Sequence, residues 1–259
     1  MDSPLRTLTV ERSDATVTIT LNRPAQRNAL TTEMIGELHR ALSEVGNSDA
    51  LAVVLAANGP VYCAGHDFAE MYHQDLVSVR RLFASCTAMM DTMQQIPQPV
   101  IARVHTLATG AGCQLVASAD LAVASHGARF ATPGGKGGLF CTTPLVAVGR
   151  AIGRKRALEM GLSGDAIDAR TAYEWGLVND VVDEDDLVAA TDALVARVTR
   201  GSVASRAIGK HAFYAQIGLD QRAAYDLAIE VMAAASLIDD AQEGIAAFLE
   251  KRPATWSRA

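Results

Sequence analysis

Two short loops of small residues are the places in the sequence where chemistry is most readily expected. One of them, Thr109-Gly110-Ala111-Gly112, follows an apolar segment and precedes a helical pattern. The first N–H groups of a helix have no partner within it, and glycines let a ligand approach the backbone closely. An N–H group in this place can bind an anion, or a carbonyl oxygen that gains negative charge. A tight turn without a ligand is the alternative interpretation.

A second loop is built in the same way. The apolar run Leu51 to Ala57 is followed by Ala64-Gly65-His66, and Asp67 and Glu70 are spaced as a helix capping box. Gly65 and His66 are therefore expected at a helix entrance, where each of the two loops can give one N–H to the same carbonyl oxygen. The His66 ring could also donate a hydrogen bond or move a proton near pH 7, unless it faces solvent or makes a structural contact.

Other reactive groups are less well supported. Cys63 and Cys113 flank the two loops and could be nucleophiles near His66, although a cysteine in such a place is more often a small buried hydrophobic residue. The segment TGAGCQ lacks the third glycine of a dinucleotide site. The cysteines show no CxxC spacing, so we expect a reduced compartment, no structural zinc and no metal site.

Buried strands that alternate with helices must position these loops. Leu51 to Ala57 and Pro99 to His105 are apolar segments typical of strands that are covered on both faces of a parallel sheet. Leu5 to Leu21 alternates as a β-hairpin, and the sequence becomes almost entirely helical at Pro144, beginning with a helix from Pro144 to Leu162. This order of elements predicts an α/β fold.

Composition and charge place the chain among globular proteins. We divide its 259 residues into an α/β core, residues 1–200, and a helical region, residues 201–259, whose apolar faces need a surface to cover. The hydrophobic content of 49% suits a sizeable core, and the net charge of −6 speaks against nucleic acid or an anionic membrane as main partner. There is no signal-peptide pattern and no apolar run of bilayer length, so we expect a cytoplasmic protein without a membrane span.

Five segments, in this order along the chain, resemble the crotonase family, which is also called the enoyl-CoA hydratase/isomerase family. They are Ile19 to Leu30, Tyr62 to Met71, Pro99 to Asp120, Ala169 to Val178 and Gln242 to Arg252. The resemblance implies a spiral of ββα units with a helical C-terminal region that packs on the core and on a neighbouring subunit of a homotrimer, with a hexamer of two trimers as an alternative. It also implies an acyl-CoA thioester as ligand.

The resemblance assigns roles to individual residues. The oxyanion-hole N–H donors fall on His66 and Ala111, and no cofactor is expected to be bound permanently, because coenzyme A arrives as part of the substrate. The side chains that could set the depth of the acyl pocket are Met71, Phe83, Met89 and Phe140. The coenzyme A contacts fall on Gln26, Arg27, Ala64, Gly65, Asp67, Phe68 and Gly110, with Lys251 near the phosphates.

Two positions depart from the family's pattern. Hydratases of this family use two glutamates to add water across a double bond, and their positions here hold Gln114 and Gly134. An amide cannot accept and return a proton at neutral pH, and glycine has no side chain. We therefore expect an acyl-CoA enzyme, nominally a hydratase of the lyase class in fatty acid metabolism. An isomerase, a thioesterase and a catalytically silent acyl-CoA-binding or regulatory protein are the alternatives.

Overall fold

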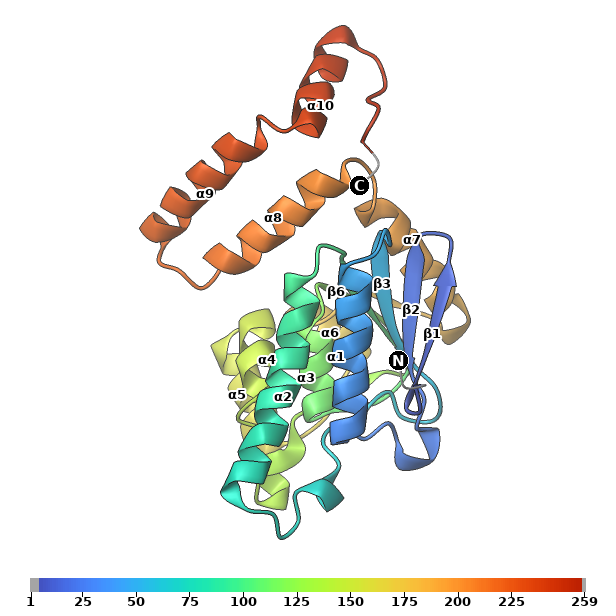
Figure 1. Ribbon diagram of the computed structural model, residues 1–259. Coiled ribbons are helices and arrows are strands. Elements are labelled where there is room, and N and C mark those ends of the chain that lie inside the picture. The colour runs from blue at the N-terminus through green and yellow to red at the C-terminus, as the bar shows by residue number, and fades with distance from the viewer. Residues whose placement is uncertain (1–4, 258–259) are drawn as a thin grey trace.

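A twisted sheet of six strands lies at the centre of the protein (Figure 1), and the computed structural model describes residues 5–257. The strand order is β1-β2-β3-β4-β6-β9. Only β1 and β2 are antiparallel, as expected of the hairpin, and the remaining pairs are parallel. The strands are β1 (Leu8–Ser13), β2 (Thr16–Leu21), β3 (Ala52–Ala57), β4 (Val100–Val104), β6 (Leu121–Ser125) and β9 (Asp180–Val182).

Helices cover both faces of this sheet. On one face, Val53 and Leu55 of β3 belong to a large core that includes side chains of α1 (Thr32–Gly46), α2 (Leu76–Gln95) and α3 (Ala111–Ser118). On the other face, Ala52 and Val54 pack in a smaller cluster with α7 (Leu187–Val198). Successive side chains of a strand point to opposite faces, so a strand covered on both must be apolar throughout. This confirms the prediction of a buried strand after Leu51.

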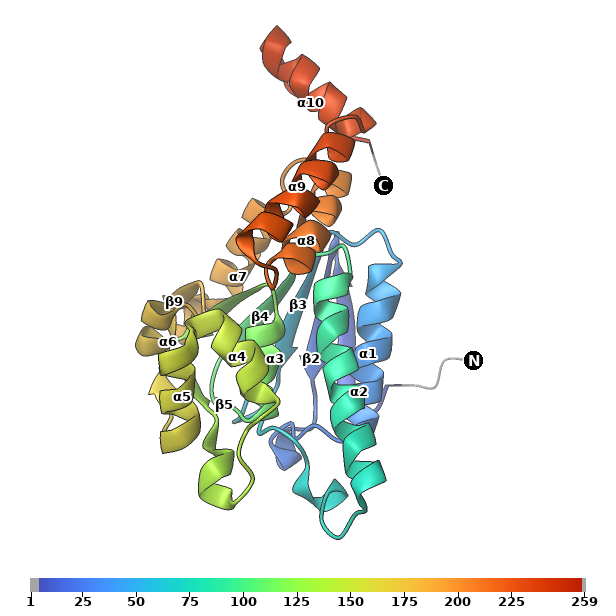
Figure 2. The same cartoon turned by 90° about the vertical axis from the view of Figure 1, so that its left-hand side faces the viewer.

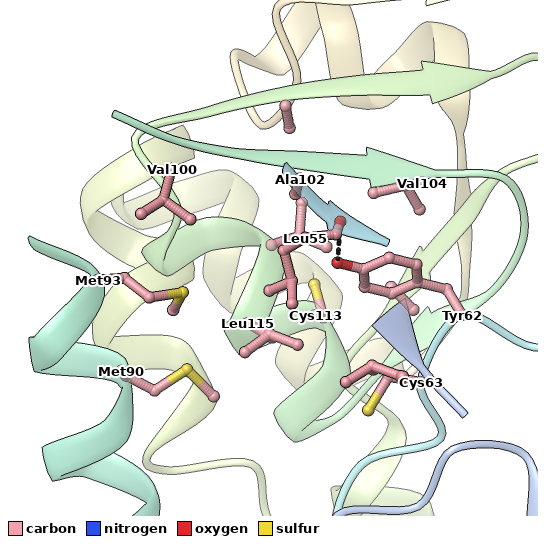
Figure 3. Packing of buried hydrophobic residues seen from close by; sticks show 14 of the residues in the cluster. Leu55, Tyr62, Cys63, Met90, Met93, Val100, Ala102, Val104, Cys113 and Leu115 are labelled. Carbon is pink, nitrogen blue, oxygen red and sulfur yellow. Dashed lines mark hydrogen bonds between the residues drawn. The ribbon is translucent and has the colours of Figure 1, made fainter. Parts of the chain in front are cut away.

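Part of the main core lies directly behind the two small-residue loops (Figure 3). Tyr62, which precedes the loop at Gly65, is completely buried, and its hydroxyl donates to the backbone oxygen of Leu55 at 3.2 Å. Cys113 and Leu115 of α3 are buried beside it, together with methionines of α2. The loops therefore rest on closely packed side chains, which leave their backbone little freedom to move.

A smaller sheet of three strands and a set of short helices follow the main core. The strands are β5 (Ala108–Thr109), β7 (Arg129–Ala131) and β8 (Ile167–Asp168), in the order β5-β7-β8. The helix predicted from Pro144 to Leu162 is in fact two helices, α4 (Pro144–Ile152) and α5 (Arg154–Ser163). Gly153 separates them because its φ of 82° lies in a region that favours glycine and ends a helix. Helix α6 (Ala169–Trp175) comes next.

The last three helices extend away from the sheet, as both ribbon views show (Figures 1 and 2). They are α8 (Val203–Gln216), α9 (Gln221–Ala235) and α10 (Asp239–Glu250). Neither α8 nor α9 contains a buried residue. The division of the chain at residue 200 remains a prediction. Within residues 5–257, no helix combines the length and the apolar character that crossing a bilayer would require.

Candidate functional site

The two small-residue loops meet in the structure. Cys63 pairs with the short strand β5, since its N–H donates to Leu107 O at 3.2 Å and its oxygen accepts from the N–H of Thr109 at 2.9 Å. A Cβ atom on Gly65 would lie only 2.9 Å from the oxygen of Thr109 and 3.1 Å from the nitrogen of Ala111. Gly65 also has a φ of +89°. Only glycine permits this approach, which brings the two predicted donor loops into contact.

Each loop leaves one backbone N–H free. Leu30 N donates to Gly65 O at 2.7 Å and Leu30 O accepts from Asp67 N at 3.0 Å, a parallel pairing that turns the N–H of His66 to the opposite side. Ala111 is the first residue of α3. Within residues 5–257, neither of these two N–H groups has a backbone or side-chain acceptor. Two unpartnered donors on touching loops can hold one carbonyl oxygen between them.

Both donor residues line a cavity of about 450 Å³ with mainly apolar walls. Met71, Phe83 and Phe140, three of the residues expected to set acyl depth, lie in its wall. The fourth, Met89, does not, because it is completely buried in the main core. The lining residues are Ala64, Gly65, His66, Phe68, Met71, Phe83, Thr109, Gly110, Ala111, Pro133, Gly134, Gly137, Leu139, Phe140, Cys141, Thr142, Thr143 and Pro144.

The ring of His66 lies in the cavity wall. It packs edge-on against Phe83, with ring centroids 5.1 Å apart and planes at 80°. Both ring nitrogens are buried and have no hydrogen-bond partner among the described residues. Burial lowers the pKa of the ring, and the negative charge of Glu70 partly opposes this shift. The imidazole is therefore neutral at pH 7, with one nitrogen as donor and the other as acceptor.

Neither of the positions at which the resemblance expects a glutamate carries an acid, and only one of them, Gly134, lines the cavity. Gln114 lies one turn after Ala111 and is buried, and its Oε1 has no partner among the described residues. Gly134 lines the cavity, where a Cβ atom would come within 2.0 Å of Leu139 O and 2.8 Å of Cys141 Sγ. The backbone at position 134 thus has no room for a side chain.

The carboxylates nearest in sequence to the His66 loop are used for structure. Asp67 accepts from the N–H of Ala69 at 3.1 Å, which caps a short 3-10 helix, Phe68–Glu70. Glu70 instead accepts from the N–H and the hydroxyl of Thr32 at the start of α1, each at 2.7 Å. The predicted capping box between Asp67 and Glu70 is therefore wrong, because Glu70 bonds a helix 38 residues earlier in the chain.

The cysteines divide into buried and accessible ones. Cys63 and Cys113 are completely buried, and burial raises the pKa of each thiol to about 12, which removes them as nucleophiles at neutral pH. Cys141, which the sequence analysis did not consider, lines the cavity and accepts from the N–H of Gly134 at 3.3 Å. The local sequence does not predict that Cys141 lines the cavity. The residue reaches the cavity because residues 134–141 fold back on themselves.

The expected coenzyme A contacts lie partly at the cavity. Ala64, Gly65, Phe68 and Gly110 line it, and Asp67 follows His66 directly. Gln26 and Arg27 are exposed and do not line the cavity, although the oxygen of Arg27 accepts from the N–H of the lining residue Ala64 at 3.1 Å. Lys251 is not brought to the cavity within one chain. It ends α10, at the far end of the projecting helices (Figure 2).

Comparisons with known proteins agree with this geometry. The family model described as enoyl-CoA hydratase/isomerase matches residues 11–259. The chain is 42% identical to enoyl-CoA hydratase domain-containing protein 3, mitochondrial, of Danio rerio, over 99% of this chain and 89% of the relative.

Solved structures of related proteins have the same fold. An enoyl-CoA hydratase of Mycobacterium smegmatis superimposes with a TM-score of 0.93 at 45% identity, covering 98% of this chain and 99% of the other. The human enoyl-CoA hydratase domain-containing protein 3 does so with a TM-score of 0.93 at 39% identity, covering 97% and 100%. The fold is that of the crotonases, and the chain belongs to the enoyl-CoA hydratase/isomerase family.

Proposed function

We propose that the cavity binds an acyl-CoA thioester whose carbonyl oxygen is held between the N–H groups of His66 and Ala111. The observation that carries this proposal is the pair of unpartnered backbone donors on touching loops at an apolar cavity. The apolar wall suits an acyl chain, and the family's description names an acyl-CoA substrate. Gln26 and Arg27, which are exposed and are joined to the lining residue Ala64 through the oxygen of Arg27, would contact the coenzyme A portion.

The reaction that such a site favours passes through an enolate of the thioester. When a water molecule takes a proton from the α-carbon, the electron pair of the C–H bond moves toward the carbonyl, and negative charge collects on the oxygen, where the two N–H groups stabilise it. Fixed donors of this kind contribute about 3 to 4 kcal/mol each to lowering the barrier. The lining residues include no Asp or Glu, so we propose that the reaction does not use the two-glutamate hydration mechanism.

The variant Ala111→Pro tests the donor assignment, because proline removes the N–H at the first position of a helix without disturbing the helix itself. We would measure exchange of the α-hydrogens of butyryl-CoA with D₂O by NMR, together with crotonyl-CoA hydration and butyryl-CoA binding by calorimetry. The expected result is a loss of about 100- to 1,000-fold in the rate of exchange or turnover. Leu76→Pro, at the exposed first position of α2, is the matched control. Equal rates in the two folded variants would contradict the assignment.

A silent acyl-CoA-binding protein is the second candidate function, and the lack of a carboxylate in the cavity lining favours it. The exchange, hydration and binding measurements also distinguish the enzyme from the silent binding protein. Butyryl-CoA binding by the wild-type protein, without exchange at the α-carbon and without turnover of crotonyl-CoA, would support the binding role. Exchange that Ala111→Pro abolishes would support the enzyme.

A further inference from the structure

The first turn of α5 carries positive charge at the end of a helix where cations are least favourable. Arg154, Lys155 and Arg156 are its first three residues, and all three are exposed. The N-terminus of a helix has a partial positive charge, so anions stabilise it and cations do not. Arg156 is used within the chain, since its guanidinium lies over the Trp175 ring, 5.6 Å from the centroid. Local structure gives no such role to Arg154 and Lys155.

An apolar cavity of about 360 Å³ lies beside these charges, between α4 and α5. Arg150 of α4 and Arg154 line it, and the other lining residues are Leu145, Val146, Gly149, Ala157 and Leu158. Within residues 5–257, neither these two arginines nor Lys155 forms an ion pair. Val146 and Leu158 are 54% and 45% exposed. This basic surface, made of Arg150, Arg154, Lys155, Val146 and Leu158, suits a partner that presents carboxylates beside an apolar side chain.

The start of α7 has the complementary composition. Glu184, Asp185 and Asp186 directly precede α7 and are exposed. Among the described residues, only the preceding Asp183 approaches a basic side chain, with its Oδ1 3.8 Å from His126 Nε2. Val188, the second residue of α7, is 52% exposed. We call Glu184, Asp185, Asp186 and Val188 the acidic surface.

The basic and acidic surfaces lie on the same side of the molecule. Arg156 Nη1 donates to Trp175 O at 3.3 Å, which holds the start of α5 against the end of α6. Strand β9 follows α6 and leads directly into the acidic residues. Figure 2 shows α5, α6 and β9 together at the left of the view. Two complementary surfaces on one side make that side self-complementary, because a two-fold rotation brings each surface of one copy to the other surface of its partner.

We propose that the basic surface of one copy binds the acidic surface of a second copy, and the reverse, about a two-fold axis. Three cations then face three carboxylates in each half of the contact, and Val188 packs on Val146 and Leu158. The contact is separate from the projecting helices α8 to α10, which extend from the other end of the molecule (Figure 2). It is also independent of the ligand that the cavity between the two loops binds.

Light scattering of the intact protein at low and high salt tests this contact. At about 0.1 M salt we expect the wild-type assembly to have twice the mass of the double variant Arg154→Glu, Lys155→Glu. At about 1 M salt, where charges are screened beyond about 3 Å, the two masses should become equal. The variant should be at least as stable to urea as the wild type, because acids suit the first turn of a helix. A lost contact is thereby distinguished from lost folding.

Arg80→Glu, Arg81→Glu makes the same charge change on the exposed side of α2 and is the matched control. This double variant should keep the wild-type mass. A lower mass of the control, equal to that of Arg154→Glu, Lys155→Glu, would show that net charge alone decides the association, and would overturn the proposal.

Exchanging the charges between the two surfaces tests the pairing itself. Asp185→Lys, Asp186→Lys should also halve the mass at low salt. An equimolar mixture of this variant with Arg154→Glu, Lys155→Glu should recover the wild-type mass, because each altered surface then meets one of opposite charge. The proposal is overturned if the wild-type mass does not change with salt, if either double variant keeps it, or if the mixture fails to recover it. Because only mass ratios are compared, the result does not depend on whether the associating unit is a monomer or a trimer.

Discussion

At the scale of single residues, the cavity combines two backbone donors with neutral side chains. Gly134 and the uncharged His66 ring lie in the cavity wall, and no Asp or Glu is among the lining residues. In the proposed function, such a wall would hold the carbonyl oxygen as it becomes negative with no carboxylate in direct contact with it. The backbone at Gly134 has no space for a side chain, which leads to a prediction about stability.

Gly134→Ala should be destabilising because the new Cβ atom would lie 2.0 Å from Leu139 O and 2.8 Å from Cys141 Sγ. Overpacking of this degree costs about 1 to 3 kcal/mol. Gly137→Ala, in the same loop, meets no atom within 4 Å and is the matched control. Urea unfolding of both variants checks the prediction, and equal stabilities would contradict it. Introducing a glutamate at position 134 would require the loop 134–141 to move as well.

Cys141 should be the cysteine that alkylating reagents reach in the folded protein, since Cys63, Cys86 and Cys113 are buried. Burial raises its pKa, so at pH 8 a smaller fraction is thiolate than in a free cysteine. We expect slow labelling by iodoacetamide at pH 8, with a rate that still increases above pH 9. Mass spectrometry of the labelled peptides measures this.

Occupancy of the cavity should slow this labelling, because Cys141 lies in its wall. The labelling rate is compared with and without saturating butyryl-CoA. In the control variant Cys141→Ser, labelling of the folded protein should disappear. Labelling of Cys63 or Cys113 at the same rate would show that the core opens more readily than its packing indicates.

At the scale of elements, an ion pair that is largely shielded from water fixes α8 to the core. Lys210 Nζ donates to Asp120 Oδ2 at 2.6 Å and to the backbone oxygens of Met93 and Gln98, each at 2.7 Å. Tyr214 donates to Asp120 Oδ1 at 2.7 Å. The side chains of Lys210 and Asp120 are only 11% and 14% exposed, so the pair is shielded from water. These contacts set where the projecting helices leave the sheet.

Lys210→Met should lower the free energy of unfolding by about 3 to 5 kcal/mol, because it leaves the buried carboxylate of Asp120 without its cation. Tyr214→Phe removes one hydrogen bond from the same carboxylate and should cost only about 1 kcal/mol. Urea unfolding of the two variants, followed by circular dichroism, makes the comparison. Losses of equal size would show that the charge of Lys210 adds nothing beyond a hydrogen bond.

At the scale of the whole molecule, the projecting helices expose large apolar side chains. Tyr225, Ile229 and Met232 of α9 are 61%, 58% and 75% exposed, and Phe248 of α10 is 82% exposed. The three α9 residues are spaced so that they share one face of the helix, and an exposed apolar face of this kind is typical of a protein interface. It agrees with the homotrimer that the sequence analysis predicts, which stays a prediction, as does the hexamer.

Light scattering after size-exclusion chromatography tests this prediction, and we expect a mass near three or six times the 27.4 kDa of one chain. The double variant Ile229→Lys, Met232→Lys places charges on the exposed face of α9 and should shift the protein toward monomer. Glu230→Lys, on the same helix, is the control for added positive charge. A wild-type protein that elutes as a monomer would contradict the prediction.

The sequence by itself determined the features that depend on neighbouring residues. The apolar runs predicted β3 and β4, and the small residues around Gly65 and Ala111 indicated where backbone donors lie, because strand burial and helix entry leave local patterns. Residue identity also shows that positions 114 and 134 hold no acid. That they correspond to the family's two glutamates stays a prediction. The resemblance to the crotonase family and the fold that it implied were also confirmed by the comparisons.

Only the tertiary structure decided which residues meet across long distances in the chain. It showed that Glu70 bonds Thr32, that Leu139 and Cys141 fill the space at Gly134, and that the ring of His66 lies unpartnered against Phe83. It also kept Lys251 away from the cavity of its own chain. These contacts join residues that are far apart in the chain. Local residue patterns reflect only the periodicity of helices and strands, so they do not predict which distant segments come together.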